Sequence, residues 1–239
     1  MKALIDLHCH SIASGHAYST IEENLAQARN KGLKIVGVAD HAPSMQGGPN
    51  IFYFYNLQAI PREVHGLTLL KGVEANIMDF QGNIDMPVEV LEKLDYAIAS
   101  LHPPCIDPGT MEENTAAILG AIHNPYVKII GHPDDSRYPL DYEVIVKAAK
   151  EHNVALEINN SSLMPYSFRS GAHENVKIIL NLCEKYGTHV ILSSDAHFST
   201  AVGDFSNCMD IIDEVHFPKA LIINFNEALI NQLMGKELL

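Results

Sequence analysis

Short apolar runs rich in β-branched residues recur along the chain and alternate with segments of helical periodicity. We expect strands at 3–7, 34–39, 67–73, 96–101, 127–131, 154–158 and 189–194. We expect helices at 20–30, 87–93, 111–122, 141–152, 174–186, 205–215 and 227–234. This alternation is typical of a parallel sheet with right-handed crossovers. It predicts an α/β barrel one strand short of eight, and a doubly wound open sheet is the alternative because alternation does not define strand order.

The length and composition indicate one domain that spans residues 1–239. A chain of 239 residues with 47% hydrophobic and 19% charged residues can bury one large core. No stretch rich in serine or proline divides the sequence into two parts.

Side chains that bind metals follow the expected strands at or near their ends. The set comprises His8, His10, His16, His41, Glu74, His102, His132, Asp195 and His197. Strand ends converge at the C-terminal face of a βα barrel, so we expect these side chains to meet there. Neutral imidazole suits zinc and similar ions, and a carboxylate can bridge two of them. The pattern therefore predicts a multinuclear metal site, with both imidazoles of the His8-Cys9-His10 segment on one strand face.

Charge and cysteine usage narrow the class of protein. A net charge of −13 argues against an extended nucleic-acid partner or an acidic membrane surface. The four cysteines lack CxxC spacing, which fits reduced thiols in the cytoplasm better than disulfides. We find no apolar run long enough for a membrane span, no signal-type leader and no glycine-rich nucleotide loop of the familiar kinds.

Six motifs together resemble the PHP family, the polymerase and histidinol phosphatase superfamily. They are DLHCHS at 6–11, ADH at 39–41, GVEAN at 72–76, SLH at 100–102, GHP at 131–133 and SSDAH at 193–197. HAYST at 16–20 and EINNSS at 157–162 make the chain look especially similar to the YcdX-type phosphatases of that family. The resemblance implies a distorted seven-stranded (βα)7 TIM-like barrel.

The resemblance also implies three divalent metal ions, usually zinc in this subgroup, with manganese or iron as alternatives. His8, His10, Glu74 and Asp195 would surround the first ion. Glu74, His102 and His132 would bind the second, and His16, His41 and His197 the third. A homotrimer is a further expectation from the resemblance, although the sequence alone defines no interface.

The expected activity is hydrolysis of a small phosphomonoester. A hydroxide held between two ions that Glu74 bridges would attack phosphorus, because coordination lowers the pKa of water. We expect Glu74 and Asp195 to be the catalytic carboxylates. Arg137 and Arg169 are candidates for bidentate phosphate contacts, although loop arginines are also commonly solvated or salt-bridged.

Other activities and assignments stay open at this point. A histidinol-phosphate phosphatase, a phosphodiesterase or exonuclease of the PHP type, and a noncatalytic assembly module stabilised by metal are the competing functions. Asn159 and Asn160 could orient metal ligands or could simply form a turn. The aromatic run at 52–55 could line the pocket, but core or interface packing is the favoured interpretation.

Overall fold

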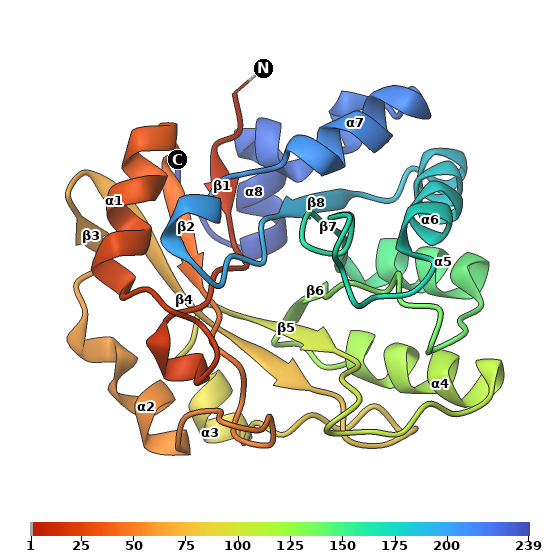
Figure 1. The fold of residues 1–239 in the computed structure, drawn as a ribbon, viewed down its shortest axis with the longest axis horizontal. Helices are drawn as coiled ribbons and strands as arrows, with labels where there is room; N and C mark the ends of the chain where they lie inside the picture. Colours follow the sequence, from red (N-terminus) through yellow and green to blue (C-terminus); the bar gives the residue numbers. More distant parts are fainter. Residues whose placement is uncertain (1) are drawn as a thin grey trace.

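The computed structural model describes residues 2–239, in which seven parallel strands curve into a distorted barrel (Figure 1). The strands are β1 (Ile5–Asp6), β2 (Ile35–Val38), β4 (Leu67–Asn76), β5 (Tyr96–Ser100), β6 (Val127–Ile130), β7 (Ala155–Asn159) and β8 (Val190–Ser193). Neighbours pair in the order β1-β2-β4-β5-β6-β7-β8. Because the order follows the chain without reversal, the barrel prediction is confirmed and the doubly wound sheet is wrong.

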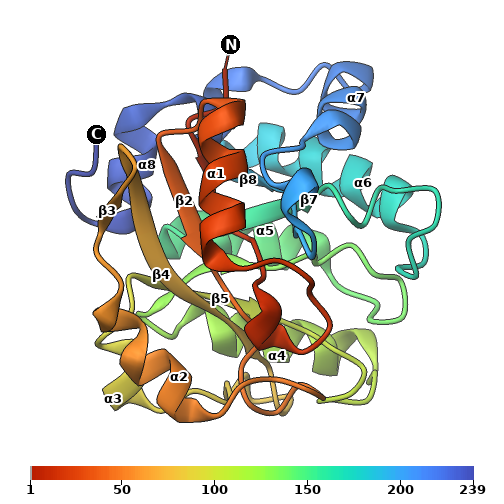
Figure 2. The ribbon, with the colours of Figure 1, turned by 60° about the vertical axis from the view of Figure 1, so that its left-hand side comes forward.

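The helices lie outside the strands, as Figures 1 and 2 show from two directions. Those expected from the sequence are α1 (Ile21–Lys31), α3 (Val88–Leu91), α4 (Met111–Ile122), α5 (Tyr142–His152), α6 (Ala172–Tyr186), α7 (Ser206–Glu214) and α8 (Glu227–Met234). All seven expected helices are present, with α3 shorter than predicted. No helix in residues 2–239 is both long and apolar enough to cross a membrane.

Apolar side chains fill the barrel and its outer layer separately. The interior cluster includes Ile35, Tyr96 and Ile191 from three different strands. The C-terminal helix α8 adds Ile230 and Leu233 to that interior cluster. Two further groups of buried side chains, one larger and one smaller than this cluster, lie between the strands and the surrounding helices. The packing leaves the C-terminal strand ends free to carry polar side chains.

Two short elements were not expected from the sequence. Strand β3 (Glu63–Val64) pairs antiparallel with the start of β4. The aromatic run lies in helix α2 (Ile51–Asn56), which begins where the Asn50 side chain accepts a hydrogen bond from the backbone N–H of Phe52 at 3.0 Å. Phe54 is buried in the core, as the favoured interpretation expects, whereas Phe52 is exposed. Both elements are too short for a clear periodicity.

A buried asparagine joins β1 to β8, two strands that form no ladder of backbone hydrogen bonds with each other within residues 2–239. The Asn224 side chain accepts a hydrogen bond from the N–H of Leu192 at 2.8 Å. It donates to the carbonyl oxygens of Ile5 at 3.0 Å and of Leu192 at 2.8 Å. Farther along this seam, the N–H of His10 donates to the carbonyl of Ala196 at 2.9 Å. The seam therefore places the His8–His10 segment beside the segment that contains Asp195 and His197.

Candidate metal centre

The nine predicted side chains gather at the C-terminal end of the barrel. His8, His10, His41, His102, His132, Asp195 and His197 lie in the segments that leave the strands, His16 lies in the first loop, and Glu74 lies within β4. Strand β4 is three residues longer than predicted, so the Glu74 side chain is held by a regular strand rather than by a loop. Apart from the exposed His16 and the half-buried His197, these residues are buried.

Glu74 is surrounded by imidazole nitrogens. Its Oε2 lies 2.7 Å from Nδ1 of His41 and 3.4 Å from Nε2 of His8. Nε2 of His10 lies 3.5 Å from the same oxygen. On the other side, Oε1 lies 2.9 Å from Nε2 of His132 and 3.2 Å from Nε2 of His102. Each oxygen of one carboxylate thus has its own group of nitrogens, which is the arrangement that a bridging ligand requires.

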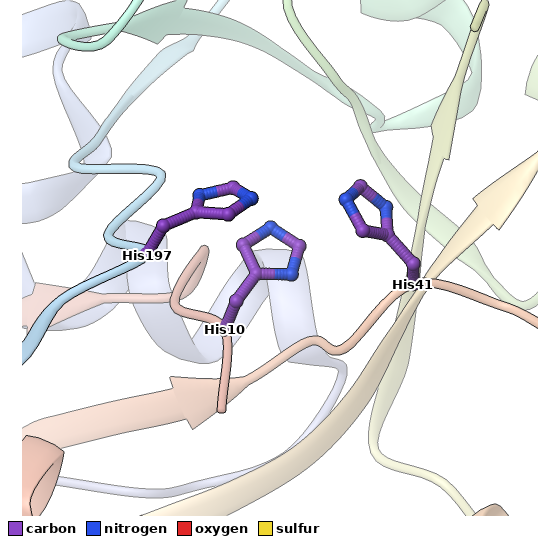
Figure 3. Close-up of side chains that lie close together, drawn as sticks. All are labelled: His10, His41 and His197. Carbon is purple, nitrogen blue, oxygen red and sulfur yellow. The ribbon is translucent and has the colours of Figure 1, made fainter. Parts of the chain in front are cut away.

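Asp195 is the second carboxylate of the cluster. Its Oδ1 lies 3.2 Å from Nε2 of His10, 3.6 Å from Nε2 of His8 and 3.5 Å from Nδ1 of His197. The rings of His10, His41 and His197 converge at this end of the barrel (Figure 3). Nε2 of His41 also lies 3.1 Å from Nε2 of His16. The cluster therefore extends from the buried Glu74 to the exposed His16.

Buried polar atoms at the centre of the cluster lack hydrogen-bond partners among the residues that the structure describes. They are Nε2 of His8, Nε2 of His10, Nδ1 of His41 and Oε2 of Glu74. Unpaired buried polar atoms are rare in folded proteins because each has lost its water without a replacement. Nitrogen and carboxylate oxygen atoms of this kind are the usual ligands of zinc and similar divalent ions. The donor set therefore fits divalent metal ions.

Three groups of potential ligand atoms lie close enough to share an ion. Within each group all atoms lie within 4.8 Å of one another. The groups are His8, His10 and Glu74; His41, Glu74 and His102; and His10, His41 and His197. The first group falls within the set expected for the first ion. The second group contains His41 together with Glu74 and His102, although the family resemblance assigns His41 to a different ion. The second and third groups share His41, whose ring lies close enough to join either group.

Burial and neighbouring charges adjust the protonation of the cluster. Burial, together with His197 and His41, lowers the pKa of His10 well below its usual value. Burial also lowers the pKa of His102 to about 4. Although burial alone would raise the pKa of Glu74, the adjacent His41 and His8 hold it well below its usual value. Neutral imidazole and ionised carboxylate are the protonation states that bind metals, and the shifts favour them for His10, His102 and Glu74.

Glu157 orients two of the histidines through hydrogen bonds. This fully buried carboxylate lies in the middle of β7, the one strand without a predicted metal ligand. Its Oε1 lies 2.6 Å from Nδ1 of His8, and its Oε2 accepts a hydrogen bond from the N–H of His132 at 2.7 Å. Asn159 donates hydrogen bonds to Glu157 at 3.0 Å and to Asp195 at 3.1 Å. Both residues lie in the EINNSS motif, from which the sequence indicated an orienting role for Asn159 but not for Glu157.

Further polar side chains hold other rings. Oδ1 of Asn76 lies 2.7 Å from Nδ1 of His102. Nδ1 of His10 lies 3.0 Å from Oγ of Ser14, which in turn donates to Asp40 at 2.6 Å. Asp40 is fully buried, and Tyr53 of helix α2 donates to its other oxygen at 2.5 Å. Asn160, the other expected orienting residue, instead accepts from the N–H of Asn207 at the start of α7, at 2.9 Å.

The two candidate arginines occupy different positions in one cavity. This cavity has a volume of about 780 Å³ and is also lined by His16, His41, His102, Asp195 and His197. The Arg169 side chain is 8% exposed, and its Nη2 donates to Oδ2 of Asp195 at 3.2 Å. The Arg137 side chain is 37% exposed, and its Nε donates to Oδ2 of Asp135 at 2.8 Å. Both arginines form ion pairs, but only Arg137 is substantially accessible from the cavity.

Known proteins resemble the chain over nearly its full length. A protein of Clostridium novyi named probable phosphatase is 48% identical over 227 residues, which are 95% of this chain and 92% of that protein. A probable phosphatase of Caldicellulosiruptor saccharolyticus is 47% identical over 92% of this chain and 91% of its own. The solved histidinol phosphate phosphatase of Lactococcus lactis, in complex with zinc, L-histidinol and phosphate, shares the fold at a TM-score of 0.62 and 19% identity, covering 91% of this chain and 95% of that chain. The PHP domain family matches residues 6–194, and the chain belongs to this family.

Proposed function

We propose that the protein is a metal-dependent phosphatase that hydrolyses a small phosphomonoester. The observation that carries this proposal is the buried Glu74, whose two oxygens face separate groups of imidazole nitrogens beside a cavity that His41 and His102 line. The names of the relatives in Clostridium and Caldicellulosiruptor support the same activity. A phosphate group suits such a site because clustered cations neutralise its charge during displacement.

The nine clustered side chains would hold three divalent ions. Seven of these side chains are histidines, which favours zinc over harder ions such as magnesium, with manganese or iron as alternatives. When bound, such ions supply positive charge for the phosphate and lower the pKa of coordinated water towards neutrality. The ligands would divide among the ions as the family resemblance implies. His41 would be close enough to bind either of two neighbouring ions.

The residues of the chain itself fix the geometry of the site before substrate binds. Glu157 accepts a hydrogen bond from Nδ1 of His8, and Nε2 of the same ring is therefore directed at Glu74. Asn76 lies at Nδ1 of His102 in the same way and leaves its Nε2 near Glu74. Because Asn76 and Glu157 sit within regular strands, they hold these rings rigidly. Catalysis benefits because a pre-oriented site does not have to reorganise during the reaction.

The arginines would act at different distances from phosphorus. Arg169 stabilises Asp195 through an ion pair inside the site and is therefore a positioning residue. Arg137 is accessible from the cavity, so it is the better candidate for contact with an anionic substrate. The substrate-binding role expected for Arg169 is thereby reduced to an indirect one in this proposal.

The test is release of inorganic phosphate from a panel of phosphomonoesters and phosphodiesters, with bound metals counted in the same preparation. We expect turnover of monoesters that disappears when a chelator removes the metals. Turnover of diesters alone would support the nuclease alternative. A metal-loaded protein that hydrolyses neither class would support the noncatalytic assembly module.

A further inference from the structure

Asp85 is a carboxylate at the end of a short hairpin that follows β4. Within the hairpin, Ile77 and Ile84 form an antiparallel bridge. The N–H of Asp85 donates to the carbonyl oxygen of Asn76 at 3.1 Å, so the hairpin returns the chain to the C-terminal end of β4. Side chains two residues apart in a strand share a face, which places Asn76 on the same face as Glu74. Asp85 therefore lies one side chain away from the metal-binding cluster.

Three N–H groups donate to the Asp85 carboxylate. The backbone N–H of Asn76 donates to Oδ1 at 2.7 Å, and the side-chain Nδ2 of Asn76 donates to Oδ2 at 2.7 Å. The backbone N–H of Ser44 donates to Oδ2 at 2.9 Å. Ser44 belongs to the loop after β2, next to Met45 and Gln46 in the wall of the cavity. One carboxylate therefore joins this loop to the side chain of Asn76.

The contacts of Asn76 determine which end of its amide faces His102. One end lies 2.7 Å from the Asp85 carboxylate and 3.5 Å from the carbonyl oxygen of Ala42. Because a carboxylate and a carbonyl oxygen accept hydrogen bonds, this end is the NH2 group. The amide oxygen Oδ1 is then the atom that lies 2.7 Å from Nδ1 of His102 and accepts its hydrogen bond. Asn76 and His102 are both buried, so water does not compete for these contacts.

We infer that Asp85 is a positioning residue that determines which ring nitrogen of His102 binds a metal ion. This inference rests on the proposed metal-dependent phosphatase function. While Nδ1 donates to Asn76, the neutral ring of His102 has its lone pair on Nε2, which lies 3.2 Å from Oε1 of Glu74. The opposite orientation of the Asn76 amide would place the ring proton on Nε2, where it blocks a metal ion. Asp85 excludes that orientation because its carboxylate would then face the amide oxygen of Asn76.

Asp85→Asn tests this role because an amide has only one acceptor oxygen. That oxygen should keep the backbone N–H of the buried Asn76, since Ser44 is exposed and its N–H can bond to water. The new NH2 group then faces Nδ2 of Asn76. When the Asn76 amide turns over, this contact between two donors is removed and the NH2 group of Asn76 faces Nδ1 of His102.

Two measurements on the zinc-loaded protein report this change. Chelator competition should show that Asp85→Asn binds one zinc ion about 10- to 100-fold more weakly. After dialysis removes the weakly bound ion, nitrogen-15 NMR should find the ring proton of His102 on Nε2 in the variant and on Nδ1 in the parent protein. The signals of this ring are assigned by their absence in His102→Gln.

Two further variants separate positioning from support of the hairpin. Asp79→Asn makes the same chemical change in the same hairpin, at a carboxylate that accepts from Gln81 and Asn83 rather than from Asn76. It should leave the zinc affinity and the ring proton unchanged. The double variant Asn76→Asp with Asp85→Asn exchanges the two side chains and puts a carboxylate, which can only accept, beside Nδ1 of His102. It should recover the zinc ion that Asp85→Asn loses.

The ring proton of His102 is observable even if the protein hydrolyses no ester, so failure of this inference differs from failure of the phosphatase proposal. A proton on Nε2 in the parent protein would overturn the inference. Unchanged zinc affinity and an unchanged ring proton in Asp85→Asn would overturn it as well. Equal losses in Asp79→Asn, or no recovery in the double variant, would do the same, because the carboxylate would then only support the hairpin.

Discussion

The carboxylate of Glu157 lies 2.6 Å from Nδ1 of His8, on the side of the ring opposite to Glu74. Both residues are fully buried, so this contact is shielded from water and salt. Glu157 raises the pKa of His8 well above its usual value, against the lowering effect of burial. Because Glu157 accepts a hydrogen bond from Nδ1, the neutral ring carries its proton there, and a metal ion would bind at Nε2 in place of the second proton of the imidazolium.

Glu157→Gln should weaken metal binding by about 10- to 100-fold. Both oxygens of Glu157 accept hydrogen bonds, one at His8 and one from the N–H of His132, and an amide offers only one acceptor. Competition with a chromogenic chelator measures the change in affinity. The control is Glu151→Gln, an exposed position on α5. Unchanged metal affinity in a folded Glu157→Gln protein would exclude an orienting role for this carboxylate.

Glu74→Gln should lower kcat by at least about 100-fold while the protein stays folded. The substitution removes the negative charge that faces five imidazoles, and it replaces one oxygen by an amide nitrogen that cannot bind a metal. Phosphate release and metal content are measured on the same sample, again beside Glu151→Gln. Normal turnover with a full complement of metals would rule out the bridging role of Glu74.

Arg169→Lys and Arg137→Lys should affect different quantities. Lysine cannot reproduce the contacts that Arg169 makes with Asp195 at 3.2 Å and with Ser162 at 3.1 Å, so we expect Arg169→Lys to weaken metal binding and reduce kcat about tenfold. Arg137→Lys should raise KM by a similar factor and leave metal affinity unchanged, because Arg137 pairs with Asp135 rather than with a metal-binding residue. Chelator competition and steady-state kinetics on both variants provide the comparison. An effect of Arg169→Lys on KM alone would instead indicate direct contact with substrate.

The main parts of the fold were predictable because apolar strands alternate with amphipathic helices along the whole chain. Each parallel strand is buried on both faces and therefore reads as an apolar run, which located all seven strands. Helix α2 and strand β3 were missed because α2 is an almost continuous aromatic run without alternating polar residues, and β3 consists of an exposed glutamate and a partly buried valine. The closure of the barrel could not be predicted either. It involves Asn224, one polar residue that contacts two distant strands, and the backbone contact between His10 and Ala196.

The position of the candidate metal ligands was predictable from their chemistry. The residues that orient these ligands were not predictable. Histidines at strand ends have few other roles in such numbers, so their convergence followed from the barrel. Glu157 and Asp40 lie in or just after strands, and nothing in their spacing distinguishes an orienting carboxylate from a ligand. The exposure of Arg137 and the burial of Arg169 depend on how loops fold, which local sequence patterns do not define.

Asn224→Leu should destabilise the protein by about 3 kcal/mol. Leucine has a similar volume but cannot pair with the N–H of Leu192 or with the carbonyl oxygens of Ile5 and Leu192, which would stay buried without these partners. Urea denaturation of the metal-loaded protein measures the change in the free energy of unfolding. Asn30→Leu, at an exposed position of α1, serves as the control and should change stability little. Equal stability of the two variants would show that the seam between β1 and β8 does not depend on Asn224.

Asp134→Asn should stabilise the protein at pH 8 by about 3 kcal/mol, and by less at pH 5. Burial raises the pKa of Asp134 to about 6, and neither carboxylate oxygen has a hydrogen-bond partner in the described part of the chain. An unfolded aspartate titrates near pH 4, so the folded state binds the proton more tightly and loses stability as the pH rises from about 4 to about 6. Asparagine removes this loss because it stays neutral. Thermal unfolding at the two pH values gives the measurement.

The neighbouring Asp135→Asn should have the opposite effect. Although burial opposes the shift, hydrogen bonds from Arg137 lower the pKa of Asp135, so its ionised form stabilises the fold. Removing that charge should therefore lower the melting temperature at pH 8, since it leaves the guanidinium of Arg137 without its partner. If both substitutions lowered the melting temperature at pH 8, the ionised Asp134 would be stabilising, and its buried carboxylate would have to be paired with Arg169 rather than isolated.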